Sequence, residues 1–225
     1  MSDDQEAWHK YPKHRKWFNK LFLAMELGYD CGPCGVAPTK TGVYVVRPTY
    51  NLSGMGFGAR LVKIEAGDTT KVPAGYFWCE YFRGKHYSAT YEWHYDRDNI
   101  WGQWRNPWKG VSCWEGINFP LNLSKFTEWK KSDYIPRVPD QLVDLRDVGR
   151  INVEFIDDKV IEVHLRDSPD PQYEHIIPIW KSDTDLHESQ SSKCYHLELQ
   201  GYKWISDYDD ADGQLSDPRL GFMVK

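Results

Sequence analysis

The stretch from Ile151 to Leu165 limits the possible fold more than any other part of this chain. Apolar and polar residues alternate along two short segments of it, with three polar residues, 157–159, between them. A period of two is typical of strands that bury one face, and two such strands joined by a short polar turn form an antiparallel hairpin. The polar face carries Asn152 and Glu154 from the first strand and Glu162, His164 and Arg166 from the second.

The register of this hairpin decides which polar side chains face one another. The two polar rows lie on one side of the sheet only if the turn holds an odd number of residues, most simply 157–159. Glu154 then faces Glu162, and Asn152 faces His164. Two carboxylates that close repel each other unless a cation lies between them, and Mg²⁺ held by carboxylates and by substrate phosphates would supply that cation. The alternative is an ordinary solvated face with surface charges.

A second informative segment is VYVVRPTYNLSGMGFGA, residues 43–59. Its first part, Val43–Val46, is rich in β-branched residues and predicts a strand. Glycine in the loop that follows lets backbone N–H groups approach phosphate oxygens, and a basic residue such as Arg47 offsets their charge. Because loops and bulges use glycine as well, the segment alone leaves a phosphate role open. The glycines of the loop are Gly54, Gly56 and Gly58.

The hairpin NVEF…KVIEVHLR resembles the metal-binding hairpin of the ATP-grasp superfamily, in which an acid or Gln is followed on the next strand by Glu-x-Asn-x-Arg. The resemblance implies that Glu154 and Glu162 bind Mg²⁺. It also implies that Arg166 is a catalytic, phosphate-facing arginine. His164 stands where the family usually has Asn, and it could bind the metal, orient a carboxylate or mark a weakened site.

The segment around Arg47 and Pro48 is similar to the phosphate-loop strand of the superfamily, especially of carbamoyl-phosphate synthetase-like members, in which an Arg-Pro or Lys-Pro precedes a glycine-rich lid. The resemblance makes Arg47 a phosphate-binding and catalytic residue, and the three loop glycines the lid. FNKLFLAMELG, residues 18–28, looks like the helix before the lid, with Lys20 as a second phosphate-binding base. A solvated lysine on an amphipathic helix is the alternative.

YFWCEYFRGKHYS, residues 76–88, resembles the hinge strand whose backbone binds adenine. The resemblance places Cys79 and Glu80 at the hinge and His86 near the ribose. A buried aromatic strand with charges at its edge is the alternative.

These resemblances imply an α+β, minimal ATP-grasp fold, with a small glycine-loop lid lobe, a larger antiparallel sheet lobe, and ATP between them. The expected division is a loose leader over 1–14, an N-terminal helix and lid lobe over 15–75, and the hinge and C-terminal lobe over 76–225, with a Trp-rich excursion over 94–135. The family usually has a substrate domain before the lid. A version with so short a leader suits a compact genome, such as that of a virus.

The implied activity is that of a carbon–nitrogen ligase that uses ATP and Mg²⁺. It would activate a small-molecule or peptide carboxylate as an acyl phosphate, which an amine then attacks. Phosphoryl transfer to a hydroxyl, and a degenerate module that binds nucleotide or a partner protein without catalysis, are the alternatives.

Composition narrows the possible partners and the cellular compartment of the protein. A net charge of −5 argues against unspecific binding to nucleic acid, and no apolar run reaches the roughly 18 residues that span a bilayer. Without a secretory signal, the five cysteines are expected to be reduced, which points to the cytoplasm. Cys31-Gly-Pro-Cys34 has the spacing of a redox site or half a zinc site, but a turn with two ordinary thiols explains it as well.

The remaining patterns predict elements around these motifs. A helix is expected over Arg15–Leu27, ended by Gly28, and a short one over Pro139–Val148. The Trp-rich segment is expected to form a structural cap over the cleft, although aromatics there could also stack on a base or sugar. Further strands are expected at Ala59–Ile64, Tyr76–Phe82, His86–Trp93 and Tyr195–Leu199.

Overall fold

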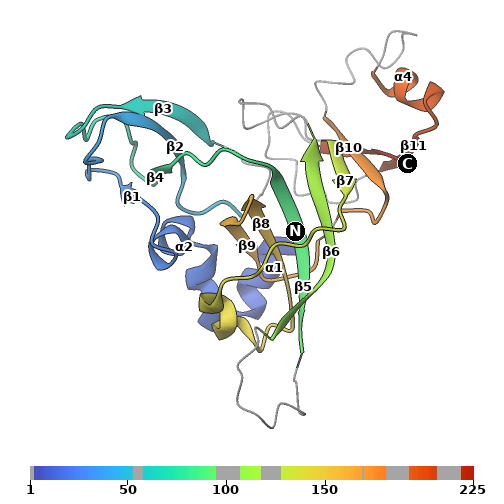
Figure 1. The fold of residues 1–225 in the computed structure, drawn as a ribbon, viewed down its shortest axis with the longest axis horizontal. Coiled ribbons are helices and arrows are strands. Elements are labelled where there is room, and N and C mark those ends of the chain that lie inside the picture. The colour runs from blue at the N-terminus through green and yellow to red at the C-terminus, as the bar shows by residue number, and fades with distance from the viewer. Residues whose placement is uncertain are drawn as a thin grey trace.

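The strands of the computed structural model form a four-stranded and an eight-stranded sheet, with antiparallel pairing throughout the described residues. The structure describes residues 3–52, 58–94, 107–117, 128–168, 170–180, 193–206 and 219–225. Figure 1 shows the smaller sheet beside the larger one, with helices packed below and between them. The chain therefore has the expected α+β class with two antiparallel sheets.

The smaller sheet has the strand order β1-β4-β2-β3. Its apolar side chains form a core of its own around Val46, Ile64 and Trp78. Trp78 closes this core at one end because its indole N–H donates to the Val36 carbonyl at 2.7 Å. The strands are β1 (Cys31–Pro33), β2 (Gly42–Pro48), β3 (Arg60–Ile64) and β4 (Tyr76–Glu80).

The larger sheet has the order β11-β12-β10-β7-β6-β5-β8-β9, so the predicted hairpin is its β8–β9 end. Its strands are β5 (His86–Trp93), β6 (Trp108–Ile117), β7 (Glu128–Lys131), β8 (Arg150–Ile156), β9 (Lys159–His164), β10 (His175–Trp180), β11 (Lys203–Ser206) and β12 (Arg219–Val224).

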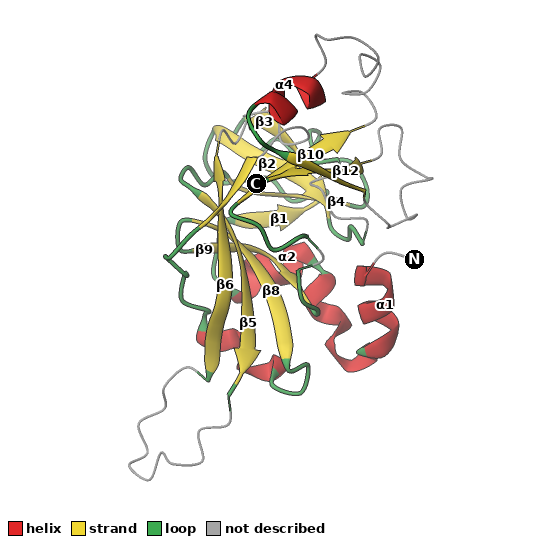
Figure 2. Ribbon diagram, turned by 90° about the vertical axis from the view of Figure 1, so that its right-hand side faces the viewer, coloured by secondary structure: helices red, strands yellow, loops and turns green. Residues whose placement is uncertain are grey.

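Helices cover the hairpin end of this sheet. They are α1 (Asp3–Lys10), the 3₁₀ helix η1 (Pro12–Phe18), α2 (Lys20–Glu26) and the 3₁₀ helix η2 (Asp140–Leu145), while α4 (Lys193–Leu199) lies near β10 and β12 (Figure 2). Helix α2 contacts β1 and β4 of the smaller sheet and β9 of the larger one, so it joins the two sheets. No helix in the described ranges is long and apolar enough to cross a membrane.

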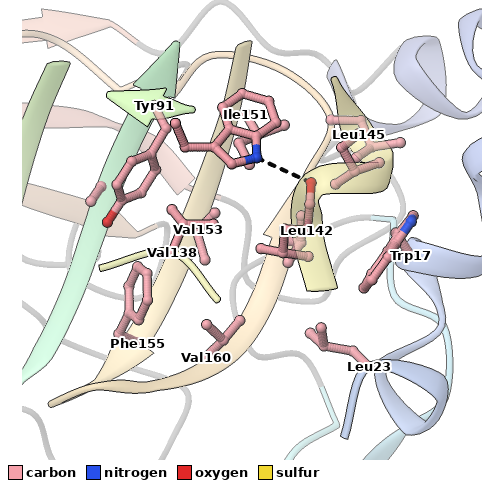
Figure 3. Packing of buried hydrophobic residues seen from close by; sticks show 14 of the residues in the cluster. Trp17, Leu23, Tyr91, Val138, Leu142, Leu145, Ile151, Val153, Phe155 and Val160 are labelled. Atoms are coloured by element: carbon pink, nitrogen blue, oxygen red, sulfur yellow. Dashed lines mark hydrogen bonds between the residues drawn. The ribbon is translucent and has the colours of Figure 1, made fainter. Parts of the chain in front are cut away.

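The main core lies between the apolar face of β5, β8 and β9 and these helices (Figure 3). Val153 and Phe155 of β8 face Leu142 of η2 and Leu23 of α2 across this core. The Trp108 indole N–H donates to the Leu142 carbonyl at 3.1 Å, which satisfies a polar group that burial would otherwise leave without a partner. The tryptophans of the Trp-rich segment that the structure describes are therefore at least partly core residues; residues 95–106 lie outside the described ranges.

Three expectations about the elements need correction. Residues 3–10, expected to be loose, form the helix α1 with Ala7 buried. The helix expected from Arg15 is interrupted at Asn19, whose side chain accepts a hydrogen bond from the Phe22 N–H at 2.9 Å and caps α2. The strand expected at Tyr195–Leu199 is the helix α4, which buries Cys194 and packs Leu197 against the same cluster.

The register of the β8–β9 hairpin is the predicted one, but the turn is not. Glu154 pairs with Glu162, and Asn152 with His164, although only Asp157 and Asp158 form the turn. A β-bulge makes up the difference, because Phe155 already pairs with Val160 and Ile161 is left as the extra residue. The bulge, and not a three-residue turn, brings the two polar rows to one face.

Candidate functional site

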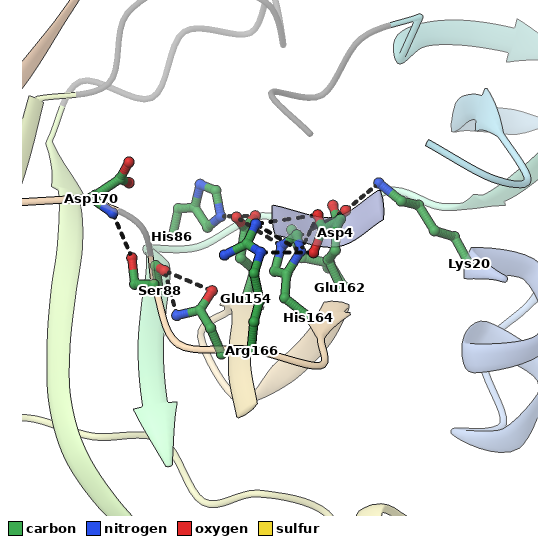
Figure 4. A network of polar contacts seen from close by, with 12 residues as sticks. Asp4, Lys20, His86, Ser88, Glu154, Glu162, His164, Arg166 and Asp170 are labelled. Atoms are coloured by element: carbon green, nitrogen blue, oxygen red, sulfur yellow. Dashed lines mark hydrogen bonds and ion pairs between the residues drawn. The ribbon is translucent and has the colours of Figure 1, made fainter. Parts of the chain in front are cut away.

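The polar face of the hairpin is buried at Asn152 and His164 and only partly exposed at Glu154, Glu162 and Arg166, which excludes an ordinary solvated face. His164 is 5% exposed, and Asn152 and His86 are comparably buried. Buried charges must be paired or bound to a ligand, so the charged side chains of this face are expected to contact one another. Figure 4 shows that its members come from β5, β8, β9, α1 and α2.

Three basic side chains, Lys20, His86 and His164, surround the two carboxylates. Lys20 Nζ lies 2.6 Å from Glu162 Oε1, and His86 Nε2 lies 3.1 Å from Glu154 Oε2. His164 Nε2 faces both carboxylates, 3.7 Å from Glu154 Oε1 and 3.8 Å from Glu162 Oε1. The repulsion expected between Glu154 and Glu162 is therefore offset by groups of the chain itself.

The proton affinities of Glu154 and His164 reflect this arrangement. Burial raises the pKa of Glu154, but His164 and His86 outweigh it and hold that pKa well below its ordinary value. Burial lowers the pKa of His164, but the charge of Asp4 and the contacts with Asp4 and Glu154 outweigh it and raise that pKa to about 10. At neutral pH the imidazole is a cation beside an anionic pair.

Asp4 of α1 is the member of the network that sequence reasoning missed. Its carboxylate is 2% exposed, and it accepts from His164 Nδ1 at 2.8 Å and from Arg166 Nε at 2.8 Å. Arg166 Nη2 reaches the same carboxylate at 3.2 Å, and Nη1 donates to the Asp167 carbonyl at 2.9 Å. Arg166 is thus held by the chain in the way that a bound carboxylate or phosphate would hold it.

Arg47, near the end of β2, contacts the backbone of the hairpin. Its Nη2 donates to the carbonyl of the bulge residue Ile161 at 3.0 Å, and its guanidinium lies over the Phe77 ring. Its Nε is buried without a hydrogen-bond partner, and no carboxylate pairs with it in the described ranges. Lys20 is close by, because its backbone N–H donates to Thr49, just after β2. Arg47 is therefore a partly buried cation whose charge is left to be balanced.

Glu154, Glu162 and His164 supply donor types that suit a divalent cation, namely two carboxylate oxygens and an imidazole nitrogen that face one another. In the part of the chain that the structure describes, no three His, Cys, Asp or Glu side chains are already placed as a metal-binding group. The two carboxylates are ligands of the kind that Mg²⁺ takes, whereas the His164 imidazole is protonated and would have to lose a proton before it could bind a metal. The present spacing of the three side chains serves ion pairs. A cation bound here competes with the Lys20 ammonium for Glu162.

Of the predicted lid glycines, only Gly58 lies in the described ranges, since Gly54 and Gly56 fall within 53–57. Gly58 has a φ of +77°, and a Cβ there would meet the Tyr76 hydroxyl at 2.9 Å. Packing at the end of the loop already requires a glycine at this position.

The hinge prediction needs correction at Cys79 and Glu80. Cys79 pairs with Cys31 of β1 on one side of β4 and with Val45 of β2 on the other, and the Glu80 N–H donates to the Asp30 carbonyl at 2.8 Å. β4 is therefore an inner strand, and its backbone has no free edge here for adenine. His86, expected near the ribose, contacts Glu154 in the carboxylate network.

The Cys31-Gly-Pro-Cys34 segment does not form a redox site in this structure. Residues 31–33 are the strand β1, and the ladder continues through a hydrogen bond from the Cys34 N–H to Tyr76. Because residues 31–33 are extended, the Cα atoms of Cys31 and Cys34 lie roughly 10 Å apart, beyond the roughly 7 Å limit of a disulfide. All five cysteines are free.

Comparison with known proteins returns little. No protein family and no curated protein matches the chain. Among solved structures, a crystal structure described as a "putative ATP-grasp superfamily protein" from Archaeoglobus fulgidus is similar over 94% of this chain, with 14% identity and a TM-score of 0.38. The chain spans 65% of that protein's length. The superfamily is the one that the sequence motifs resemble, but a likeness of this size carries no argument, so the function has to be inferred from the residues themselves.

Proposed function

We propose that the chain binds the triphosphate of ATP together with Mg²⁺ and uses them to activate a carboxylate as an acyl phosphate for attack by an amine. The observation that carries the proposal is that unlike charges reach the same β8–β9 hairpin. The Arg47 guanidinium, which has no carboxylate partner in the described ranges, donates to the carbonyl of Ile161, the residue before Glu162 of the carboxylate pair. Nucleotide phosphates and a divalent cation would satisfy both.

Each residue has a distinct part in this proposal. Arg47 and Lys20 bind phosphate oxygens, and Lys20 exchanges its ion pair with Glu162 for them. Glu162, thereby released, would hold Mg²⁺ together with Glu154 and, once its ring had lost a proton, His164. The ion would neutralise charge on the phosphoryl group being transferred. Arg166 stays on Asp4 and stabilises the phosphate side of the site through its charge.

Arg47→Ala is expected to weaken ATP binding about tenfold or more, because a charge-assisted contact to phosphate contributes roughly 1.5–3 kcal/mol. Isothermal titration calorimetry in the presence of Mg²⁺ measures this affinity. The fold should persist, since the guanidinium forms no ion pair with a described residue.

Arg60→Ala is the matched control for this experiment. Arg60 also stacks over an aromatic ring of the smaller sheet, that of Tyr76, but it is exposed and points away from the hairpin contact of Arg47. Unchanged ATP affinity in Arg47→Ala, or an equal loss in Arg60→Ala, would remove Arg47 from the phosphate site.

One observation favours the non-catalytic alternative. His164 and Lys20 neutralise the carboxylate pair without a metal, as expected of a module that binds a nucleotide or partner and transfers nothing. ADP release measured with a panel of carboxylates and amines, alone and paired, separates the candidates. Release that needs both substrates supports the ligase, release with a hydroxyl acceptor supports a kinase, and binding without release supports the module.

A further inference from the structure

We propose that Cys31 and Cys79 form a reversible oxidation site, at which a low-molecular-weight disulfide such as oxidised glutathione converts the two thiols into a disulfide between β1 and β4. Both cysteines are free in this structure. The bond would fix the edge strand β1, and with it the end of α2, to the strand beside it. This site is independent of the proposed function, since it needs neither nucleotide nor metal.

The register of β1 and β4 places the two cysteines directly opposite each other. In an antiparallel pair of strands, opposed residues alternate between hydrogen-bonded and non-hydrogen-bonded pairs, and the Cα atoms of the latter are only about 4.5 Å apart. The Glu80 N–H donates to the Asp30 carbonyl at 2.8 Å, so the neighbouring pair is hydrogen-bonded and the cysteine pair is not. A Cα separation of about 4.5 Å lies within the range of roughly 4.4–6.8 Å that disulfides usually have.

The side chains of the two cysteines also lie on the same face of the smaller sheet. Cys79 is 3% exposed in a cluster with Ala24 of α2 and Phe77 of β4, and Cys31 packs against this cluster. Opposed residues of an antiparallel pair share a face, and here it is the face that α2 covers. The fold has therefore already brought the two thiols together, which it does not do for Cys31 and Cys34.

Cys31 is the thiol that an oxidant reaches first, because it is partly exposed whereas Cys79 is buried. Burial, together with the nearby carboxylates of Asp30 and Glu80, raises the pKa of the Cys31 thiol. Burial also raises the pKa of Cys79 to about 12. Both thiols are therefore protonated at neutral pH, and the reduced pair persists until an oxidant is present.

Oxidation proceeds by two thiol–disulfide exchange steps. The Cys31 thiolate attacks one sulfur of oxidised glutathione, which forms a mixed disulfide and releases one glutathione thiolate. The Cys79 thiolate then attacks Cys31 Sγ of the mixed disulfide and releases the second glutathione thiolate. The two protons that the cysteines lose go to the two glutathione thiolates. Two cysteines are oxidised and one glutathione disulfide is reduced to two thiols, so an excess of reduced glutathione reverses the reaction.

The disulfide would act where the two sheets are joined. Strand β1 follows α2 in the chain, lies at the end of the smaller sheet and pairs with β4 over residues 31–33 (Figure 1). Helix α2 contacts β1, β4 and β9. A bond between positions 31 and 79 closes a loop of roughly 50 residues, and such a bond stabilises a protein mainly by restricting its unfolded chain. We therefore expect the oxidised chain to be the more stable form.

The test incubates the full chain with oxidised glutathione and then alkylates the remaining thiols in urea. Mass spectrometry of the proteolysed product identifies the linked cysteines, and circular dichroism gives the melting temperature. We expect a Cys31–Cys79 link and the loss of two of the five free thiols. The melting temperature should rise by roughly 5 °C or more, and dithiothreitol should reverse the rise.

Three variants serve as controls. Cys34→Ser is the matched one, because Cys34 is an exposed cysteine of the same Cys-Gly-Pro-Cys segment, and this variant should be oxidised like the parent. Cys31→Ser should gain neither a disulfide within the chain nor a higher melting temperature. Cys79→Ala should stop at the mixed disulfide of Cys31 with glutathione. If Cys79→Ala does not fold, Cys31→Ser decides alone, since the loss of either thiol prevents the bond.

Three results would overturn the proposal. The first is a Cys31–Cys34 link, and the second is a chain that carries only glutathione adducts or keeps all five thiols at equilibrium. The third is a Cys31–Cys79 link that leaves the melting temperature unchanged, because the bond would then not fix β1. None of these results depends on whether the chain binds ATP, so a failure of the proposed function remains distinguishable from a failure of this site.

Discussion

Glu162→Gln is expected to abolish Mg²⁺-dependent ADP release and to lower the free energy of unfolding by roughly 3 kcal/mol. The amide keeps the shape of the side chain and loses the charge that a hard dication needs. Lys20, 7% exposed at its side chain, is then left as a buried ammonium without the carboxylate that lies 2.6 Å away in the parent. Sequence reasoning alone would predict a stable or stabilised variant, because it considers only the repulsion between Glu154 and Glu162.

A double-mutant cycle with Lys20→Met checks the stability part of this prediction by urea denaturation. The double variant should be more stable than the sum of the single changes implies, with a coupling of roughly 1.5 kcal/mol or more. Glu115→Gln is the control, because its partner Lys85 is at 2.8 Å but largely exposed, and such surface pairs contribute at most about 1 kcal/mol. Full ADP release by Glu162→Gln would end the metal-ligand interpretation.

Leu142→Ala is expected to lower the free energy of unfolding by about 2–5 kcal/mol. Leu142 is fully buried in the main core between η2 and the face of β8 that opposes the carboxylates (Figure 3). Removing its side chain leaves a cavity behind the strand that carries Glu154. ATP affinity at low temperature should change little in the protein that remains folded.

The neighbouring residue provides the control for this change. Val143, on the same 3₁₀ helix, is 44% exposed, so Val143→Ala should shift stability by less than about 0.5 kcal/mol. Urea titrations of both variants measure the two free energies of unfolding. Equal unfolding midpoints would show that Leu142 does not belong to the main core.

Single strands and the hairpin could be predicted from the sequence, because the alternation that marks them is visible within a few neighbouring residues. Alternation over His86–Trp93 marks β5 with its correct ends, and the alternation that pairs Glu154 with Glu162 sets the face of the hairpin. The bulge at Ile161 could not be predicted, since a bulge and a longer turn give the same register. The alternating Tyr195–Leu199 stretch suggested a strand, but the contacts of Cys194 and Leu197 favour a helix.

The incomplete part of the site prediction concerns contacts between distant segments. Asp4 gives no local signal of its role, because its partners His164 and Arg166 lie in another part of the chain. Lys20 and Glu162 were each found through a motif, but the ion pair between them was not predicted. Asn19 did leave a signal, since an asparagine before an amphipathic run marks a helix N-cap.

The contact between α1 and β9 also sets the order in which the molecule can assemble. Asp4 and His164 are separated by 160 positions, and contacts of such range close slowly because a long loop of chain must be ordered first. During synthesis α1 emerges before the β8–β9 hairpin, so the Asp4 carboxylate has neither of these partners until the ribosome has passed Arg166. Helix α1 therefore cannot reach its final place before the strand that receives it is available.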